Sequence, residues 1–481
     1  MSHPHPNPVR TVCRATLGAV LLALPLAWGP VALAQEAGDG LAWTQFQGDP
    51  AHSGLLAEAP EPPYRQRWRF SPDGGALSGA VITGSTVIAV GEAAVHALDL
   101  ETGEVAWELP RAGGRISMPA LGSGPDGSVL VFLDGPATSE EGATPTPSPT
   151  PSAEEDGVSD LVAVSIPSRE ELWRTALQAS SRSGVTVAGD LVVVGDDEGT
   201  VYGVELTTGS VLWTAGSAGR VEAPPAVAGG RVYVASRDVD GRRAELLAVD
   251  AGSGEPVWTF VPQSGAVVAS APSATEEAVV IGSADRLVRR FAAEGGDVAW
   301  ASLTLTLFSP VTAPALAGED LVVADASGGV YRLDPADGTR LWEHQLNEII
   351  VRSAPVLSSG HVLIGLNDGR LVALDPGNGD LVWQSPASQG LIGAIALSPE
   401  AVVAVKGGED PGLIAYEHDP DASLVRIASP TVVDPGRLYG NFALALLIAG
   451  AAIYVPFRFL RTRMGPAFDG EDGGDEPEAE T

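Results

Sequence analysis

The stretch ALDLETGEVAW at residues 97–107 occurs twice more in closely similar form, as AVDAGSGEPVW at 248–258 and as ALDPGNGDLVW at 373–383. Each copy ends in a tryptophan. The full series is Trp68, Trp107, Trp173, Trp213, Trp258, Trp300, Trp342 and Trp383. Neighbouring members are 39 to 45 residues apart, except for the one longer step from Trp107 to Trp173. A period of this length is typical of the blades of a β-propeller, so the repeat decides the fold class.

The residues between the tryptophans form short runs rich in β-branched residues, separated by Gly, Asp and Pro. Examples are Ala80–Gly84, Thr86–Val90 and Ala94–Leu98. Such runs indicate strands joined by turns, and each repeat unit supplies four of them. Long helical periodicity is absent from this part of the chain, which argues against an alternating βα architecture. We therefore predict an all-β fold.

The number of blades depends on how the two ends of the repeat region combine. Seven units end in their own tryptophan, whereas the eighth, from about Gly390 to Asp419, has none. Conversely, Arg65–Phe70 contains Trp68 but has no strands before it. Joining the two predicts an eight-bladed propeller and removes the exposed strand edges of an open array. The alternative is that Leu424–Ala428 completes the last blade and leaves Trp68 peripheral.

The N-terminus, residues 1–34, has the features of a secretory signal peptide. Arg10 and Arg14 accompany an apolar stretch, and the small-residue site Ala32–Ala34 follows it. The only cysteine, Cys13, leaves with this segment. The mature chain is therefore predicted to have no disulfide, no cysteine-based metal site and no cysteine nucleophile.

A second apolar segment, Leu438–Phe457, is long enough as a helix to cross roughly 30 Å of hydrocarbon. Arg458, Arg461 and Arg463 follow it, and only Arg437 precedes it. The positive-inside rule then places the C-terminus in the cytoplasm and the propeller outside. We predict a single-pass protein of the cell membrane, of a kind expected in bacteria.

The predicted domain layout follows from these features. It comprises the signal peptide (1–34), the propeller (43–419), a stalk (420–437), a transmembrane helix (438–457) and an acidic cytoplasmic tail (458–481). Within the propeller, residues 137–157 are rich in Thr, Pro and Ser and predict a disordered insertion. It is either a plain insertion or a site of O-linked glycosylation.

The chain carries a formal net charge of −33. Seven of the acids lie in the tail and five of the arginines lie in the signal peptide or directly after the apolar span, which leaves 54 acids against 23 bases for the exported part. The resulting negative electrostatic field opposes binding to nucleic acid, because that binding depends on Lys and Arg neutralising phosphates. The charge either keeps the protein soluble or attracts cations and basic partners.

The repeat unit Ala-x-Asp-x-x-Thr-Gly-x-x-x-Trp resembles the tryptophan-docking repeat of the PQQ-like, quinoprotein-type β-propellers. This family includes PQQ-dependent alcohol dehydrogenases and BamB-type assembly propellers. The resemblance covers roughly residues 43–419 and includes the lead-in WTQFQGDPAHSG at residues 43–54. It implies an eight-bladed fold.

The resemblance also implies that each tryptophan docks on the neighbouring blade, next to a glycine in a tight turn that requires a positive φ. The docking residues are then the eight tryptophans above with Gly103, Gly209, Gly254, Gly296, Gly338 and Gly379. Two units depart from the pattern, since Arg169 replaces the glycine in one, and Arg290 and Ala292 replace the alanine and aspartate in the other. Docking is an open question at these two units.

The dehydrogenases of this family hold PQQ and Ca²⁺ at the propeller centre, with a vicinal cysteine pair against the cofactor. This chain has no such pair, and no set of cation ligands can be assigned from spacing. The recurrent Asp99, Asp250, Asp334 and Asp375 stand just before a turn, so we expect them to accept hydrogen bonds from the turn backbone. Signatures of zinc proteases, serine hydrolases and phosphate-binding loops are also absent from the sequence. We predict no catalytic or metal-binding residue and leave cofactor-binding residues unassigned.

These observations favour a membrane-anchored extracytoplasmic propeller that acts as a non-enzymatic, protein-binding or assembly scaffold for other envelope or membrane proteins. The alternative is a quinoprotein oxidoreductase that depends on PQQ and calcium. A sensor that signals through the span is less favoured, because the predicted tail is too short to hold a domain.

Overall fold

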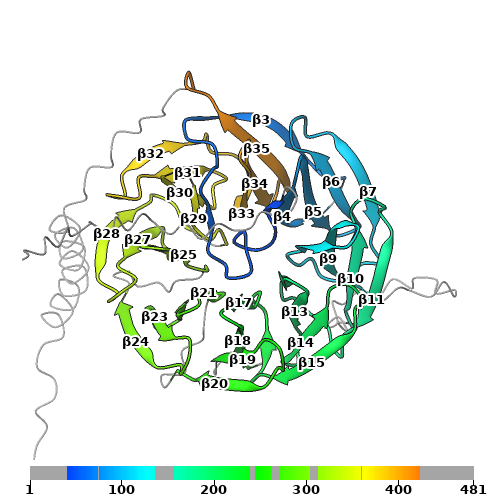
Figure 1. The fold of residues 1–481 in the computed structure, drawn as a ribbon. Coiled ribbons are helices and arrows are strands. Elements are labelled where there is room, and N and C mark those ends of the chain that lie inside the picture. The colour runs from blue at the N-terminus through cyan, green and yellow to red at the C-terminus, as the bar shows by residue number, and fades with distance from the viewer. Residues whose placement is uncertain are drawn as a thin grey trace, which may run out of the picture.

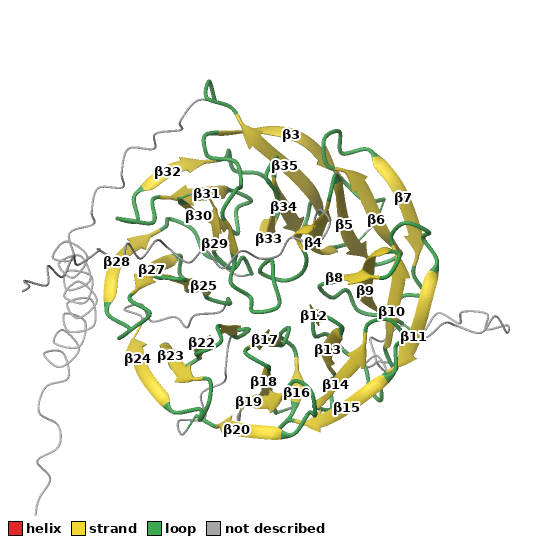
Figure 2. Cartoon of the chain, viewed as in Figure 1, coloured by secondary structure: helices red, strands yellow, loops and turns green. Residues whose placement is uncertain are grey.

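The computed structural model describes residues 41–422, apart from residues 74, 136–156, 239–243, 263–269, 304–311, 351 and 359. In this part of the chain the regular secondary structure is entirely β, and its eight sheets form a closed ring (Figure 1 and Figure 2). The predicted signal peptide, the transmembrane helix, the tail and nearly all of the insertion and stalk lie outside the described residues. No helix that could cross a membrane is found within residues 41–422 as described.

Four blades, numbered by their order along the chain, make up the first half of the ring. Blade 1 contains β1 (Leu41–Trp43), β4 (Leu77–Thr83), β5 (Thr86–Gly91), β6 (Ala94–Asp99) and β7 (Val105–Pro110). Blade 2 contains β8 (Ala120–Gly124), β9 (Gly127–Asp134), β10 (Asp160–Ser165) and β11 (Glu171–Ala176). Blade 3 contains β12 (Thr186–Ala188), β13 (Leu191–Gly195), β14 (Thr200–Glu205) and β15 (Val211–Gly216). Blade 4 contains β16 (Arg220–Val221), β17 (Ala226–Ala228), β18 (Arg231–Arg237), β19 (Ala244–Asp250) and β20 (Pro256–Phe260).

The other four blades complete the ring, and two of them include strands from near the N-terminus. Blade 5 contains β21 (Ser273–Ala274), β22 (Ala278–Gly282), β23 (Leu287–Ala292) and β24 (Val298–Leu303). Blade 6 contains β25 (Ala315–Ala317), β26 (Asp320–Ala324), β27 (Gly329–Leu333) and β28 (Arg340–Gln345). Blade 7 contains β2 (Leu55–Leu56), β29 (Val356–Ser358), β30 (His361–Gly365), β31 (Leu371–Leu374) and β32 (Leu381–Gln384). Blade 8 contains β3 (Tyr64–Phe70), β33 (Leu391–Leu397), β34 (Val402–Gly407) and β35 (Gly412–His418).

The burial of each strand reflects its place in the blade. The second strands, such as β5 and β13, are buried almost throughout, because each blade is covered by a neighbour on both faces. The outermost strand β15 instead alternates between exposed and buried positions. Apolar residues of adjacent blades therefore form separate hydrophobic clusters between the sheets, and these clusters constitute the core.

The ring closes in blade 8 through pairing of the two ends of the repeat region. β3 pairs antiparallel with β35, with Trp68 opposite Ala415 and Phe70 opposite Leu413. The prediction of eight blades closed by the N-terminal strand is confirmed. Because β3 occupies the outer position, Leu424–Ala428 is not needed to complete this blade, and the alternative closure is wrong.

The strand order also divides the turns between two faces of the ring. Consecutive strands of each blade are antiparallel, so the turns from first to second strand and from third to fourth strand lie at one end of every blade. We call this end the lower face, and we call the opposite end the upper face.

Candidate interaction site at the hub and the lower face

The residues Thr44–Leu56, which we call the hub segment, enter the centre of the ring (Figure 1). The segment accepts backbone hydrogen bonds from the innermost part of successive blades. The bonds run from Leu121 to Thr44 at 2.7 Å, from Val227 to Pro50 at 2.7 Å, from Ala274 to Ala51 at 2.8 Å, from Leu316 to Ser53 at 2.9 Å and from Leu357 to Gly54 at 2.6 Å. In addition, β1 pairs with β4 and β2 pairs with β29. Through these pairings and the backbone bonds above, the N-terminal chain contacts blades 1, 2, 4, 5, 6 and 7 in order.

Two glutamine side chains extend these contacts. Gln45 makes a two-way amide pair with Val187 of blade 3, since Nε2 donates to the carbonyl at 3.1 Å and Oε1 accepts from the amide at 2.7 Å. Gln47 Nε2 lies 3.3 Å from the Pro355 carbonyl and 3.5 Å from that of Pro314. The hub segment thus joins blades that are far apart in sequence.

Phe46 of this segment is partly buried. It packs against a group of alanines that lie just before the innermost strands of four blades, namely Ala223, Ala271, Ala313 and Ala354. Its ring also lies edge-on to His52 at a centroid distance of 5.1 Å. His52 is fully buried and its Nδ1 lies 2.9 Å from the Pro272 carbonyl. Burial lowers the pKa of His52 to about 4, so this side chain is neutral at physiological pH.

The hub offers a poor fit for PQQ with calcium. A planar quinone needs open space at the centre of the ring, which the hub segment enters. Calcium prefers carboxylate and carbonyl oxygens in a set of six to eight ligands. Across the described part of the chain, no group of three or more His, Cys, Asp or Glu side chains is placed to hold a metal ion. The described residues therefore do not fit the cofactor.

The recurrent aspartates accept hydrogen bonds from the backbone of their own turns. Asp99 Oδ1 accepts hydrogen bonds from the backbone amides of Glu101 and Thr102 at 3.1 and 2.8 Å. Asp250, Asp334 and Asp375 accept equivalent backbone bonds in blades 4, 6 and 7. The expectation of bonds within each blade is confirmed at these four positions.

Six tryptophans insert into the next blade with a common geometry. The indole Nε1 donates to a turn carbonyl of that blade. The pairs are Trp68 to Leu100 at 2.8 Å, Trp173 to Leu206 at 2.7 Å, Trp213 to Ala251 at 2.9 Å, Trp258 to Ala293 at 2.9 Å, Trp300 to Pro335 at 2.9 Å and Trp342 to Pro376 at 2.6 Å.

The predicted turn glycines lie directly under these indole rings. A Cβ built on any of them would come within 2.5 to 2.7 Å of a ring atom, and each has a φ between +70° and +76°. The glycines are Gly103, Gly209, Gly254, Gly296, Gly338 and Gly379. The unit with Ala292 in place of aspartate keeps the same geometry, because its Gly296 lies under Trp258.

The two remaining tryptophans have different surroundings. Trp107 faces the turn of blade 2 that contains Arg169, is only partly buried, and makes no indole hydrogen bond within the described residues. Arg169 nevertheless has a φ of +63°, and its amide donates to Ser165 at 2.8 Å, as glycine does in the regular turns. Trp383 lies against the closing blade, edge-on to Tyr64 and Tyr416 at centroid distances of 5.0 and 6.0 Å.

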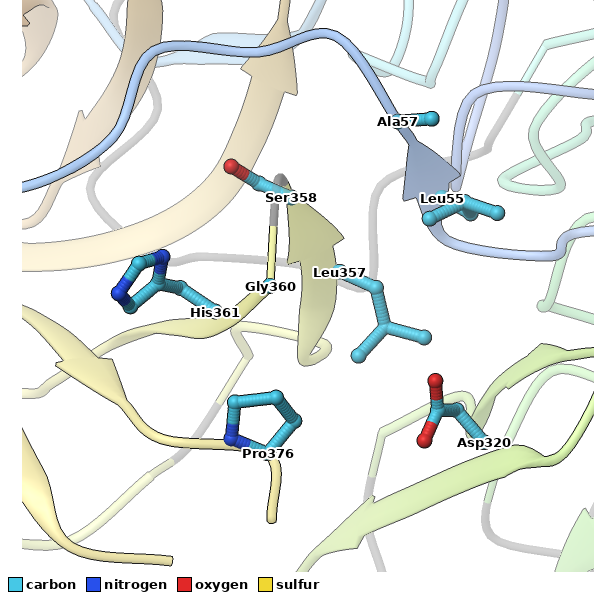
Figure 3. A pocket seen from close by; sticks show the side chains of 8 residues that line it. All are labelled: Leu55, Ala57, Asp320, Leu357, Ser358, Gly360, His361 and Pro376. Carbon is cyan, nitrogen blue, oxygen red and sulfur yellow. The ribbon is translucent and has the colours of Figure 1, made fainter.

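A pocket of about 170 Å³ opens on the lower face between blades 6 and 7 (Figure 3). Its walls come from the end of the hub segment, from the turns of both blades and from β29. The lining residues are Leu55, Ala57, Asp320, Leu357, Ser358, Gly360, His361 and Pro376. In Figure 3 the Leu357 side chain lies in the middle of the group, with Leu55, Asp320 and Pro376 around it.

Sequence reasoning did not identify the hub segment or this pocket as functional features. The lead-in at residues 43–54 was noted only as part of the family resemblance, although its buried Trp43 and its glutamines indicate an ordered segment. The pocket combines residues that are up to about 320 positions apart, and no local signal connects them.

The family model described as outer membrane protein assembly factor BamB matches residues 158–301, 239–348 and 293–404. These ranges together span residues 158–404, which is just over half of the chain. BamB from Yersinia pestis is 26% identical over 300 residues, covering 58% of this chain and 66% of the relative. BamB from Burkholderia pseudomallei (strain K96243) is 29% identical over 187 residues, covering 36% and 48%. The chain thus spans less than two thirds of either relative.

Solved structures show the same fold at low sequence identity. BamB from Moraxella catarrhalis aligns with a TM-score of 0.56 and 17% identity, covering 74% of this chain and all of that one. The quinohemoprotein alcohol dehydrogenase ADHIIG from Pseudomonas putida HK5 aligns with a TM-score of 0.58 and 12% identity, covering 80% and 81%. From the extent of the family match, the chain belongs to the PQQ-like propeller family described as outer membrane protein assembly factor BamB.

Proposed function

We propose that this chain is a non-enzymatic scaffold that binds other envelope or membrane proteins through an extracytoplasmic propeller. The observation that carries the proposal is the filling of the hub by the chain's own N-terminal segment. The hub segment enters the centre of the ring, where the family's dehydrogenases hold their cofactor, so the proposal assigns function to the faces and the rim. The names of the relatives, outer membrane protein assembly factors, point to the same class of function.

The location rests on the sequence. The signal at residues 1–34, the apolar span at Leu438–Phe457 and the arginines that follow it support a single-pass anchor with the propeller outside the cell membrane. A scaffold held in this way would meet its partners at a fixed distance from the bilayer.

The docking tryptophans make the scaffold rigid in this proposal. Each buried indole removes apolar surface from water and satisfies a turn carbonyl of the next blade, and together these effects stabilise a junction by roughly 2–4 kcal/mol. A rigid ring loses little conformational freedom when a partner binds, which favours affinity.

Affinity purification of the tagged full-length chain from detergent-solubilised membranes tests the proposal. We expect a small set of envelope or membrane proteins to be retained at defined stoichiometry. The matched control is an equally tagged chain with Trp213→Ala and Trp342→Ala, which weakens the ring without changing the anchor. Equal retention by both chains, or no specific retention by the native one, would contradict the scaffold.

The alternative is a PQQ- and calcium-dependent oxidoreductase. It draws on the likeness to the quinohemoprotein dehydrogenase, which concerns the fold alone. Incubation of the purified chain with PQQ and Ca²⁺, followed by a dye-linked assay with alcohols and sugars, separates the two functions. Cofactor-dependent turnover would establish the enzyme and overturn the scaffold.

A further inference from the structure

The pocket between blades 6 and 7 has the dimensions of a receptor for a single side chain. A cavity of about 150 Å³ lined by apolar groups is known to hold one benzene molecule, so 170 Å³ accommodates a branched aliphatic or aromatic side chain. The pocket opens to the lower face, because Asp320, Gly360 and Pro376 all lie in or beside lower-face turns. A partner that approaches this face would reach it without any rearrangement of the ring.

The apolar part of the pocket includes a side chain that is left uncovered. Leu55 is 38% exposed, whereas Leu357, its partner in the parallel β2–β29 pairing, is 4% exposed. Trp43, directly before the hub segment, is by contrast fully buried. Covering Leu55 with another apolar side chain would remove this surface from water and supply part of a binding energy.

The polar side chains that line the pocket are those of Asp320, Ser358 and His361, and Asp320 supplies a carboxylate. The Asp320 side chain is 39% exposed, and one of its oxygens lies 2.8 Å from Arg332 Nη2. A carboxylate can accept up to four hydrogen bonds, so Asp320 keeps acceptor capacity for an incoming donor. Arg332 also donates to the Pro376 carbonyl at 3.2 Å, which ties the two sides of the pocket together.

The turns around the pocket carry one sign of charge. Within the described residues, the lower-face turns contain sixteen acids and a single base, Arg169. The acids between first and second strands are Asp126, Asp190, Glu276, Glu277, Glu319 and Glu400. Those between third and fourth strands are Glu101, Glu104, Glu170, Glu255, Glu294, Asp297, Asp334, Asp337, Asp375 and Asp380. Such a face attracts positive charge and steers it toward the surface.

We infer that this pocket receives a large aliphatic or aromatic side chain from an extended segment of a partner protein, and that an adjacent Arg or Lys of that segment pairs with Asp320. The size of the cavity indicates one large side chain, and the exposed Leu55 favours an apolar one. The acidic surroundings favour an Arg or Lys beside it. The inference rests on the proposed function, because it names the chemistry of the partner that the scaffold binds.

Fluorescence polarisation with a labelled synthetic peptide tests this inference. The probe is Gly-Ser-Leu-Arg-Leu-Arg-Ser-Gly, titrated with the purified full-length chain in detergent. We expect saturable binding that weakens when the leucines become glycine or the arginines become glutamate. Absence of saturable binding at millimolar chain concentration, or equal binding of all three peptides, would overturn the inference.

Four variants locate the binding. Leu55→Ala and Asp320→Asn should each raise the dissociation constant about fivefold, which corresponds to the loss of one modest contact. Asp190→Asn removes a carboxylate from the lower-face turn between the first two strands of blade 3, and Leu212→Ala removes an exposed leucine of the outermost strand β15, so neither should alter binding. Equal effects of pocket and control variants would show that the peptide binds the acidic face in general, which overturns the pocket.

Three other results separate the remaining possibilities. If a second copy of this chain occupies the pocket, sedimentation will show a dimer that Leu55→Ala dissociates, and the inferred partner is wrong. If the pocket variants bind the peptide as tightly as the native chain does, while the native chain still retains envelope proteins, the inference about the pocket is wrong and the scaffold function is supported. If neither the peptide nor envelope proteins bind, the inference and the scaffold function are both wrong.

Discussion

The junction between blades 1 and 2 and the six regular junctions use the same turn with different results. Arg169 adopts a φ of +63°, close to the +72° of Gly254, and both amides make the same turn hydrogen bond at 2.8 Å. Yet Trp213 docks over Gly254, whereas Trp107 makes no indole hydrogen bond in the described structure. The comparison teaches that the glycine is needed less for its φ than for the close approach of the indole ring.

The largest expected effect is the loss of a docked ring. Trp213→Ala removes a buried indole and its hydrogen bond to Ala251, and should lower the free energy of unfolding by about 4 kcal/mol. Trp107→Ala removes a partly buried ring that makes no indole hydrogen bond to any described residue, and should cost about half as much. Urea denaturation of the full chain measures both. Equal losses would contradict the difference between the two kinds of junction.

The hub should give the next largest effect. The pKa of His52 is lowered to about 4 in the folded state from about 6.5 in the unfolded chain, so the unfolded state binds more protons between these values. Stability is therefore complete above pH 6.5 and should fall by roughly 3 kcal/mol as the pH drops to 4.

The control for this prediction is His52→Asn, which tolerates the positive φ and offers an amide donor to Pro272. Unfolding free energies measured from pH 7 to pH 4 should then lack the contribution of His52. If the native chain and the variant lose stability in parallel, His52 is not the titrating group.

Adding a methyl group under a docked ring should have an intermediate effect. Gly254→Ala places Cβ within 2.7 Å of Trp213 and also strains a φ of +72°, and should cost about 2–3 kcal/mol. Gly230 in the same blade has the same φ with nothing within 4 Å, so Gly230→Ala should cost only about 1 kcal/mol. Thermal unfolding distinguishes the two. Similar shifts would mean that φ, and not the approach of the ring, requires glycine.

The smallest effect should come from making the irregular junction regular. Arg169→Gly relieves the positive φ of a residue with a side chain and frees the site that Trp107 faces, so it should stabilise the chain by about 0.5–1 kcal/mol. The indole N–H of Trp107 should then exchange with solvent more slowly by NMR. A destabilised chain with unchanged exchange would show that Trp107 cannot dock for another reason.

The ring itself was predictable because its signals are local and repeated. The tryptophan period, the β-branched runs and the aspartate before four of the turns lie within single units, and the unit count led to the closure by Arg65–Phe70. The departure at Arg169 was also visible in the sequence. Its consequence depends on the distance between a Cβ and an indole ring, which only the structure supplies.

The hub and the pocket could not be predicted in this way. The hub segment has no periodicity, and its partners, from Leu121 to Leu357, lie about 75 to 300 residues away. The pocket needs Leu55, Asp320 and Pro376 to meet at one end of two blades. Such features arise from ring closure, and therefore from the whole fold.

The scaffold is tested most directly by carbodiimide cross-linking of native membranes followed by mass spectrometry. The reagent joins carboxylates to amines, and the chain's only lysine, Lys406, is fully buried, so links within the chain should be rare. We predict that lower-face carboxylates, Asp320 among them, are joined to lysines of other envelope proteins. Links confined to the chain itself, with no partner joined to the propeller, would contradict the account.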